Sequence, residues 1–176
     1  MIKKIALAIL VLFLFNGCAS SYDCDDDESA YTALLILNGI DDADNDFLDE
    51  FNKNFDIIAS YDYELLKKDK EEKVSFCKLN INIDLTAKSL KEANKKVKAF
   101  GFLNSAQYIA QARAMKSDYG RQMEKEIIQD IELKNTLNKE DFKSYNNKAN
   151  ILSGTISYNY IAYDNGKGEI LIKVEK

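Results

Sequence analysis

The chain has 176 residues, and its 24 lysines and arginines stand against 29 aspartates and glutamates, which gives a formal net charge of −5. This length is sufficient for one domain with a hydrophobic core, or for two small lobes that share one. An acidic chain is a poor candidate for nucleic-acid binding, which needs clustered basic side chains, so we expect no nucleic acid among its partners. The lack of histidine in the sequence excludes catalytic triads, Cys–His pairs and histidine-ligated zinc sites.

The first residues are typical of a secretory signal. Lys3 and Lys4 make the start basic, and an uncharged apolar run from Ile5 to Phe15 follows. This run is shorter than the roughly 20 apolar residues that a membrane-spanning helix needs. We therefore predict a signal segment rather than a permanent membrane span.

The end of this segment, Asn16-Gly17-Cys18-Ala19, resembles the lipobox of bacterial lipoproteins. The resemblance implies that residues 1–17 are a lipoprotein signal peptide and that Cys18 becomes the lipidated first residue of the mature chain. The membrane is then a partner through the N-terminal lipid, because several acyl chains give stable anchoring. The alternative is an ordinary cleaved signal in which the cysteine is incidental.

Residues 18–29 are polar and acidic, which predicts a solvated tether, and we expect residues 30–176 to form a single domain. Outside the cytoplasm, Cys24 and Cys77 could form one disulfide. The alternative is that Cys77 is a buried apolar residue and Cys24 a free thiol in the tether. With Cys18 lipidated, a four-thiolate site cannot form, and we expect no metal and no cofactor.

The first half of the domain is predicted to contain two helices and a hairpin. In chain order the elements are an apolar segment over 30–40, a helix over 44–55, a strand over 57–65, a charged turn over 67–73 and a strand over 74–85. The segment over 30–40 is short enough to be a helix or a strand, and we favour the helix. Asp44 or Asp46 is available as the N-cap of the second helix. In the second strand, Cys77 and Leu79 lie on the apolar face and Asn80 on the polar face.

The second half is predicted to contain two helices and another hairpin. In chain order these are a helix over 87–100 that ends at Gly101, a longer helix over 104–137 weakened around Gly120, a strand over 150–162, a turn over 164–168 and a strand over 169–175. The fold class is α+β, with an antiparallel sheet built from two hairpins and helices packed on one face. One interpretation is a duplicated helix–hairpin unit.

Two groups of polar and aromatic residues need interpretation. Asp42, Asp44 and Asp46 alternate like the start of an EF-hand calcium loop, but Phe47 and Lys53 stand where that loop needs Gly and Glu. We therefore interpret these aspartates as part of a solvated loop and helix start, without a metal site.

The strands are rich in tyrosine, at Tyr61, Tyr63, Tyr158, Tyr160 and Tyr163. Tyrosines that alternate along a strand can form a contact surface for a partner. We favour the alternative, in which they are half-buried residues of the sheet.

Three segments of the second half carry a further resemblance: Val97–Phe102, the alanine-rich Ala106–Ala114, and Gly154–Ile156 with the closing hairpin to Val174. Together they resemble the domain of the Lpp-twenty type of small outer-membrane lipoproteins, which includes flagellar-assembly lipoproteins. The resemblance implies a strand over 97–102, where residue spacing predicts a helix, and a structural or assembly role without catalytic residues.

The sequence therefore predicts a lipid-anchored protein of the cell envelope. We expect it at the outer membrane, facing the periplasm or the surface, since alanine rather than aspartate follows Cys18. The expected role is structural or in assembly, through contacts with an envelope protein partner, and not enzymatic. The alternative is a periplasmic small-ligand-binding module with a pocket between sheet and helices.

Overall fold

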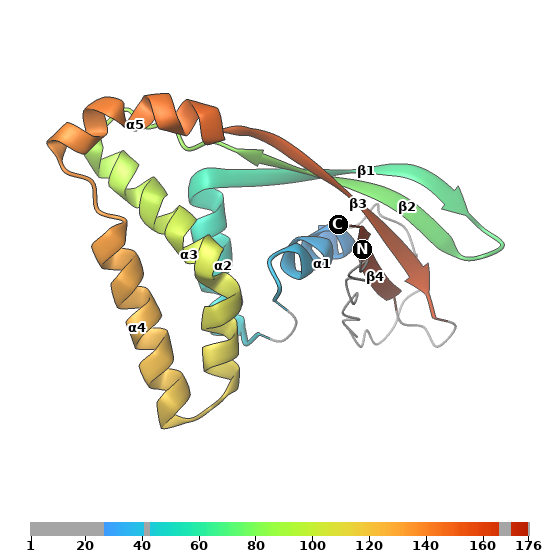
Figure 1. Ribbon diagram of the computed structural model, residues 1–176. Helices are drawn as coiled ribbons and strands as arrows, with labels where there is room; N and C mark the ends of the chain where they lie inside the picture. Colours follow the sequence, from blue (N-terminus) through green and yellow to red (C-terminus); the bar gives the residue numbers. More distant parts are fainter. Residues whose placement is uncertain (1–26, 41–42, 166–169, 176) are drawn as a thin grey trace, which may run out of the picture. The chain divides into compact units, whose positions relative to one another are not determined.

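The computed structural model describes residues 27–40, 43–165 and 170–175. Its elements, drawn in Figure 1, are α1 (Asp27–Leu37), α2 (Asn45–Ile58), β1 (Ala59–Asp69), β2 (Val74–Ile83), α3 (Leu90–Ala114), α4 (Asp118–Lys134), α5 (Lys139–Leu152), β3 (Gly154–Asp164) and β4 (Ile170–Glu175). The predicted signal peptide, most of the predicted tether, and Cys18 and Cys24 lie outside the described residues.

The predicted α+β class and the two hairpins are confirmed. The hairpins β1–β2 and β3–β4 form one antiparallel sheet with the strand order β1-β2-β3-β4. In the second hairpin Asn159 lies opposite Glu175 and Asp164 opposite Ile170. Between the hairpins, Ser157 Oγ donates a hydrogen bond of 2.7 Å to Asn80 Oδ1. The join between β2 and β3 therefore makes one sheet from two hairpins that are distant in sequence.

The chain divides into two compact units. Unit 1 comprises Asp62–Asn80 with the described residues of Met1–Leu37 and Ser157–Lys176, and unit 2 comprises Asn38–Tyr61 and Ile81–Ile156. Along the chain, β1, β2 and β3 each contribute residues to both units. A helix directly precedes each hairpin, as expected, whereas duplication of this unit stays a prediction.

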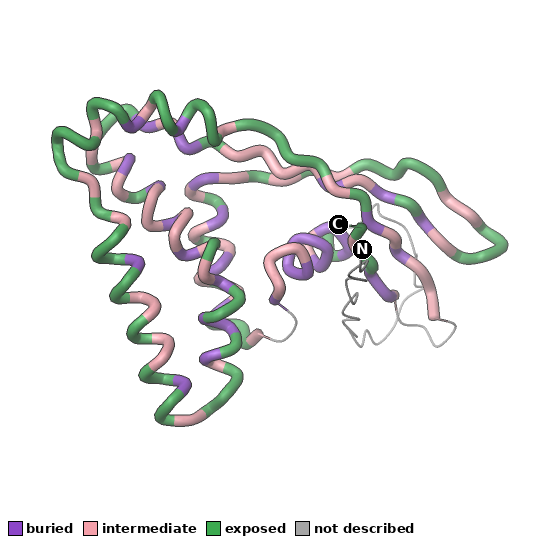
Figure 2. The backbone as a smooth tube through the Cα atoms, in the orientation of Figure 1, coloured by how far each residue is buried: buried purple, intermediate pink, exposed green. Residues whose placement is uncertain are grey.

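Unit 1 is built around α1, which is apolar on all sides and almost wholly buried (Figure 2). The helix packs against β4. The predicted helix over 30–40 is confirmed, but it begins at Asp27, so the last three residues of the predicted tether are helical. Asp27 and Glu28 suit the first turn because the helix dipole favours negative charge there, and Ser29 is already buried.

Unit 2 is organised by phenylalanines on α2. Phe47, Phe51 and Phe55 stack successively, with ring centroids 6.4 and 6.1 Å apart. Phe102 of α3 lies 6.1 Å from Phe47. The helix begins as predicted at Asp44, whose carboxylate accepts a hydrogen bond of 2.8 Å from the backbone N–H of Phe47. The i, i+4 spacing of the three phenylalanines places them on one face of α2, where they pack against each other and against α3.

A second cluster in unit 2 joins α3 and α5 to the ends of β1 and β2. Its buried members are Ile58, Leu85, Ala87, Ala93, Ala99, Tyr145 and Ala149, with Ala59 and Ile83 packed against them. The helices of this unit therefore pack against strand residues, as the α+β prediction requires. The sequence did not predict α5 as an element of its own.

The predicted helix break at Gly101 is wrong. A single helix, α3, runs from Leu90 to Ala114, and the chain turns only afterwards, where Lys116 has a positive φ of 48°. Gly101 lies against α4, because a Cβ atom there would meet Asn135 Nδ2 at 2.6 Å and Ile131 Cγ2 at 3.3 Å. This glycine permits close helix packing. Residues 97–102 are helical as their spacing predicts, so the strand implied by the family resemblance does not form.

The boundaries of the first strand also differ from the prediction. Ile57 and Ile58 complete α2, and β1 begins at Ala59 and continues through the lysines to Asp69. The turn is confined to Lys70–Lys73. The lysines can lie in a strand because their charged ends reach solvent from either face. The turn predicted over 164–168 falls largely outside the described residues.

Replacing Gly120 with alanine is expected to destabilise the protein. A Cβ atom at Gly120 would overlap the backbone carbonyl oxygen of Ala112 and meet Met115 Cβ at 3.0 Å. We expect Gly120→Ala to lower the free energy of unfolding by about 1–3 kcal/mol, although alanine favours a helix by about 1 kcal/mol. Urea unfolding measures this, with exposed Gln129→Ala as the control. Equal or greater stability of Gly120→Ala would contradict the close α3–α4 contact.

Candidate functional site

A groove between α2 and α3 is one of two candidate binding sites, both in unit 2. It measures about 390 Å³ and is lined by Lys53, Asp56, Ile57, Glu92, Lys95 and Lys96. On each helix the lining residues are spaced i, i+3, i+4, so they share one face. The groove presents ammonium and carboxylate groups together, which suits a small ligand that carries both charges.

Lys96, one of the residues that line this groove, belongs to a hydrogen-bonded network. The ammonium of Lys96 is largely buried and donates to the carbonyl oxygen of Asp84 at 3.0 Å and to its carboxylate at 3.1 Å. Hydrogen bonds from the side chain and backbone of Thr86, followed by that from Lys96, hold the pKa of Asp84 below its ordinary value. Asp84 thus remains an anion that fixes Lys96 in place.

The same network reaches α5 through Tyr145. Its hydroxyl donates to the carbonyl oxygen of Leu85. Burial, with the negative charges of Asp84 and Glu92, raises the pKa of Tyr145. The phenol therefore stays protonated and acts as a structural donor, and the pKa shifts of Asp84 and Tyr145 both lead away from neutrality.

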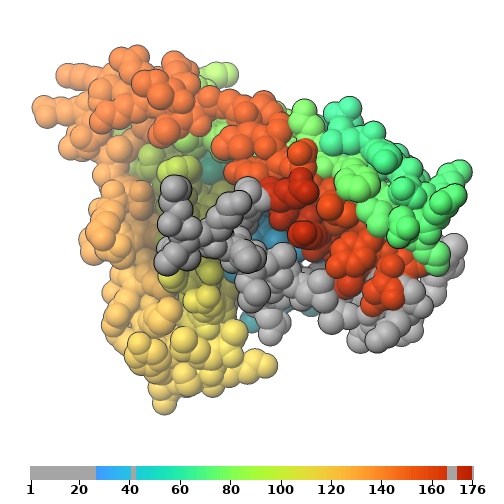
Figure 3. All heavy atoms as spheres, turned by 45° about the vertical axis from the view of Figure 1, so that its right-hand side comes forward, coloured from blue at the N-terminus to red at the C-terminus, as the bar shows by residue number. Residues whose placement is uncertain are grey.

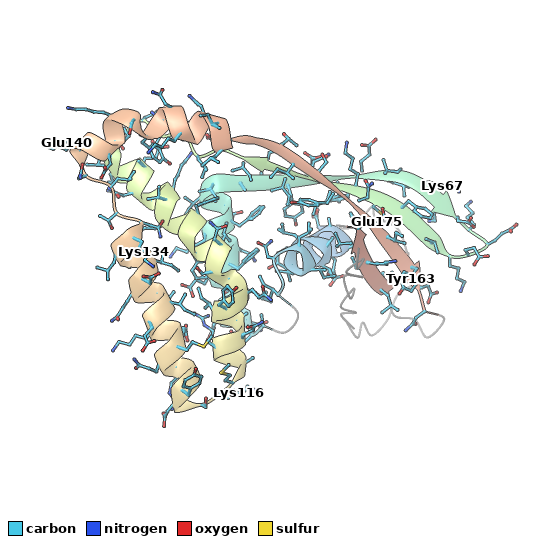
Figure 4. The ribbon with its side chains drawn as sticks, viewed as in Figure 1. Lys67, Lys116, Lys134, Glu140, Tyr163 and Glu175 are labelled. Carbon is cyan, nitrogen blue, oxygen red and sulfur yellow. The ribbon has the colours of Figure 1, made fainter. Side chains whose placement is uncertain are left out.

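The second groove lies between α3 and α4, which run antiparallel as neighbours (Figure 1). It measures about 370 Å³ and is lined by Ser105, Tyr108, Met123, Glu126, Ile127 and Asp130. Figure 4 labels Lys116, in the turn between α3 and α4, and Lys134, the last residue of α4. The two acidic side chains already have neighbours on α4, since Gln122 bonds Glu126 and Lys134 bonds Asp130, each at 2.7 Å. The groove is therefore mainly an apolar surface with an acidic rim.

Arg113 joins the three helices that form these grooves. Its guanidinium donates to Glu50 of α2 at 2.6 Å and to Glu124 of α4 at 2.8 Å, and it lies 5.4 Å from the ring centroid of Phe47. Burial opposes its charge, but the two carboxylates raise the pKa of Arg113 above its ordinary value. Sequence analysis missed this residue, whose only signal is a long basic side chain between alanines.

Of the three cysteines predicted as site residues, Cys77 lies within the described part of the chain. Cys77 is fully buried on β2 and is disulfide-bonded. Cys18 and Cys24 lie outside the described residues, so lipidation of Cys18 and the pairing of Cys24 with Cys77 stay predictions.

The two aspartates that the structure describes lie at a helix start, as predicted. Asp44 is the N-cap of α2, and Asp46 is exposed in its first turn. Asp42 lies outside the described residues. Within residues 27–40, 43–165 and 170–175, the Cys, Asp and Glu side chains nowhere gather in a group of three that could hold a metal ion.

The tyrosines are sheet residues, as favoured. Tyr160 is fully buried, and Tyr61, Tyr63, Tyr158 and Tyr163 are half-buried. They therefore do not form an exposed aromatic surface. As for membrane spans, the helices that the structure describes are all too short or too polar to cross a bilayer.

Comparison with models of protein families, with curated protein sequences and with solved structures finds no match to this chain. Its likeness to the Lpp-twenty type of lipoprotein therefore stays a prediction. The candidate sites rest on the geometry of this chain alone.

Replacing Arg113 with lysine is expected to loosen unit 2. Lysine keeps the charge but cannot bond Glu50 and Glu124 together while stacking on Phe47. We expect Arg113→Lys to cost about 1–3 kcal/mol in free energy of unfolding. Arg121→Lys, in an exposed pair with Asp118, is the matched control and should cost less than about 0.5 kcal/mol. Equal effects of the two substitutions in urea unfolding would argue against the role of Arg113.

Asp84 is expected to make stability depend on acid pH. Because its pKa is lowered by folding, its contribution is complete above the unfolded value and is lost as pH falls below about 4 through the folded value. Urea titrations at neutral and acid pH should therefore show a smaller loss of stability on acidification in Asp84→Asn than in the wild type. Asp130→Asn, in an exposed ion pair with Lys134, is the comparison. The same loss in Asp84→Asn as in the wild type would rule out this linkage.

Proposed function

We propose that this chain is a lipid-anchored cell-envelope protein with a structural or assembly role, which acts through contacts with other envelope proteins and not as an enzyme. The observation that carries the proposal is the ending of the apolar leader in Gly17-Cys18, where cleavage before Cys18 would follow lipid attachment to its thiol. On this proposal the lipid holds the domain at the outer membrane, facing the periplasm or the surface.

The character of the folded residues supports a contact role. The perturbed titrating groups, Asp84, Arg113 and Tyr145, all serve structural bonds between elements. In contrast, large apolar side chains stand exposed on helices and strands, including Leu133 at 81% and Ile151 at 82%. Exposed apolar groups of this size are typical of protein interaction surfaces when they cluster.

A second candidate function is the binding of a small ligand in the periplasm. The α2–α3 groove favours it, because Lys53 and Lys95 could receive a carboxylate while Asp56 receives an ammonium group. This proposal needs a cleaved signal but no lipid. Whether Cys18 is lipidated therefore distinguishes the anchored role from the ligand-binding role.

The intact mass of the protein from a membrane fraction tests the anchor. We expect the wild type to be cut before Cys18 and to carry acyl chains, because only a cysteine at this position can accept the lipid. Cys18→Ser should lack both the acyl mass and the membrane association. A soluble wild type without acyl chains would refute the anchored role and would favour ligand binding.

A further inference from the structure

The groove between α3 and α4 continues into further apolar side chains near the turn that joins the two helices. Tyr108 of α3 and Met123 and Ile127 of α4 line the groove itself. Tyr119 lies one turn before Met123, and Met115 lies two turns after Tyr108. Tyr108 is 57% exposed, Met115 47% and Tyr119 71%. Together these five side chains form one apolar strip along the helix pair.

The apolar strip lies beside the line along which α3 and α4 pack. On α4 this line is marked by the buried residues Gly120 and Ile131. A Cβ atom at Gly120 would overlap the backbone of Ala112. At about 100° per residue, Tyr119 and Met123 are turned away from this line. In Figure 3 the light orange atoms of α4 form a column at one edge of unit 2. The contact with α3 therefore leaves much of the strip exposed.

The dimensions of the strip suit a helix. From Tyr119 to Asp130 it extends over about 16 Å, or three turns, since each helical residue rises 1.5 Å. The side-chain ridges of a third helix can pack into the groove between two neighbouring helices, through residues spaced i, i+3, i+4 and i+7. A strand would gain few backbone hydrogen bonds here, because the backbone groups of α3 and α4 are bonded within each helix.

The outer edge of the groove is acidic. Glu126 and Asp130, one turn apart on α4, both line it. Their neighbours at 2.7 Å, Gln122 and Lys134, belong to the same helix, and exposed pairs of this i, i+4 kind contribute little stability. A carboxylate accepts several hydrogen bonds, so each can also receive a lysine or arginine from a partner. A second copy of this chain would instead bring two acidic edges together, which disfavours self-association.

We propose that the α3–α4 groove binds an amphipathic helix of another envelope protein, whose apolar face covers the strip and whose lysines or arginines face Glu126 and Asp130. The inference rests on the proposed contact role and adds the chemical class of the partner. An apolar helix without basic residues would leave the acidic edge unmatched. A basic helix without an apolar face would leave the strip exposed.

A model peptide tests the proposal. The probe is a fluorescein-labelled peptide of about 18 leucines and lysines, with the leucines at i, i+3, i+4 and i+7 so that they share one face. Its binding to the purified full chain is measured by fluorescence anisotropy, with the purification detergent alone as the blank. We expect saturable binding, at least about tenfold tighter than for a peptide of the same composition without an apolar face. An analogue with glutamate in place of lysine should also bind at least about tenfold more weakly.

Substitutions on α4 locate the binding site. Ile127→Glu places a charge in the groove, whereas Leu133→Glu places the same charge on the far side of the helix, at a residue that is 81% exposed. We expect Ile127→Glu to weaken peptide binding at least about tenfold and Leu133→Glu less than about twofold. Tyr119→Ser is a second strip variant, at an exposed residue outside the buried contacts of α4, and should weaken binding about threefold or more.

Charge reversal tests the acidic edge. We expect Glu126→Lys to weaken binding of the basic peptide about fivefold or more, because a lysine would then face the lysines of the peptide. Glu140→Lys is the matched control, at an exposed residue of α5 that is labelled in Figure 4. It changes the net charge of the protein by the same amount, so it should leave binding nearly unchanged if the contact is local.

Several results would overturn the proposal. One is the lack of saturable binding of the basic peptide, and others are equal binding by the wild type and Ile127→Glu, or by Glu126→Lys and Glu140→Lys. A wild type that dimerises in sedimentation equilibrium, and that Ile127→Glu makes monomeric, would assign the groove to a second copy instead. These measurements use purified protein, so their failure would leave the acylation of Cys18 to be judged separately by intact mass.

Discussion

The guanidinium of Arg113 is the interaction on which the helical unit depends. It bonds a carboxylate on α2 and another on α4 and lies over Phe47 at the start of the aromatic stack. A planar group with several donors can satisfy two acids and an aromatic face at once, which a point charge cannot. Both grooves between the helices follow from this arrangement, since their walls are the helices that Arg113 holds.

Close packing of α3 and α4 is the second constraint. Gly101 and Gly120 stand where any side chain would meet the neighbouring helix, through Asn135 in one case and the backbone of Ala112 in the other. Small residues let two helices approach until their backbones nearly touch. Along α4 the buried residues are Gly120 and Ile131, so the helix contacts the rest of its unit over a narrow strip.

The two faces of the sheet differ in polarity: one face is buried and the other is polar. One face buries Cys77, Leu79 and Tyr160. The other carries a polar row in which Asp62, Asn80 and Ser157 bond across three strands. Such a row fixes the register of the strands, because a shift by one residue would turn the polar groups into the core. The described strands thus form a sheet whose register is fixed by polar groups on one face and by buried side chains on the other.

Local patterns in the sequence determined much of this protein. The spacing of Phe47, Phe51 and Phe55 predicted α2, the aspartate before it predicted the cap, and alternation around Cys77 predicted β2. These features depend on residues close in sequence, for which helix and strand periods suffice. The leader ending in Gly17-Cys18 is likewise a local pattern, and the envelope role proposed for this chain rests on it.

The tertiary structure decided what depends on distant residues. Gly101 has the local character of a helix break, but it is a contact point for Asn135 and Ile131, which lie far along the chain. The role of Arg113 depends on Glu50 and Glu124 from two other helices, and the edge position of β1 depends on the order in which the hairpins join. Contacts between residues that are distant in sequence produce no periodic pattern, because tertiary packing and not local spacing determines which residues meet.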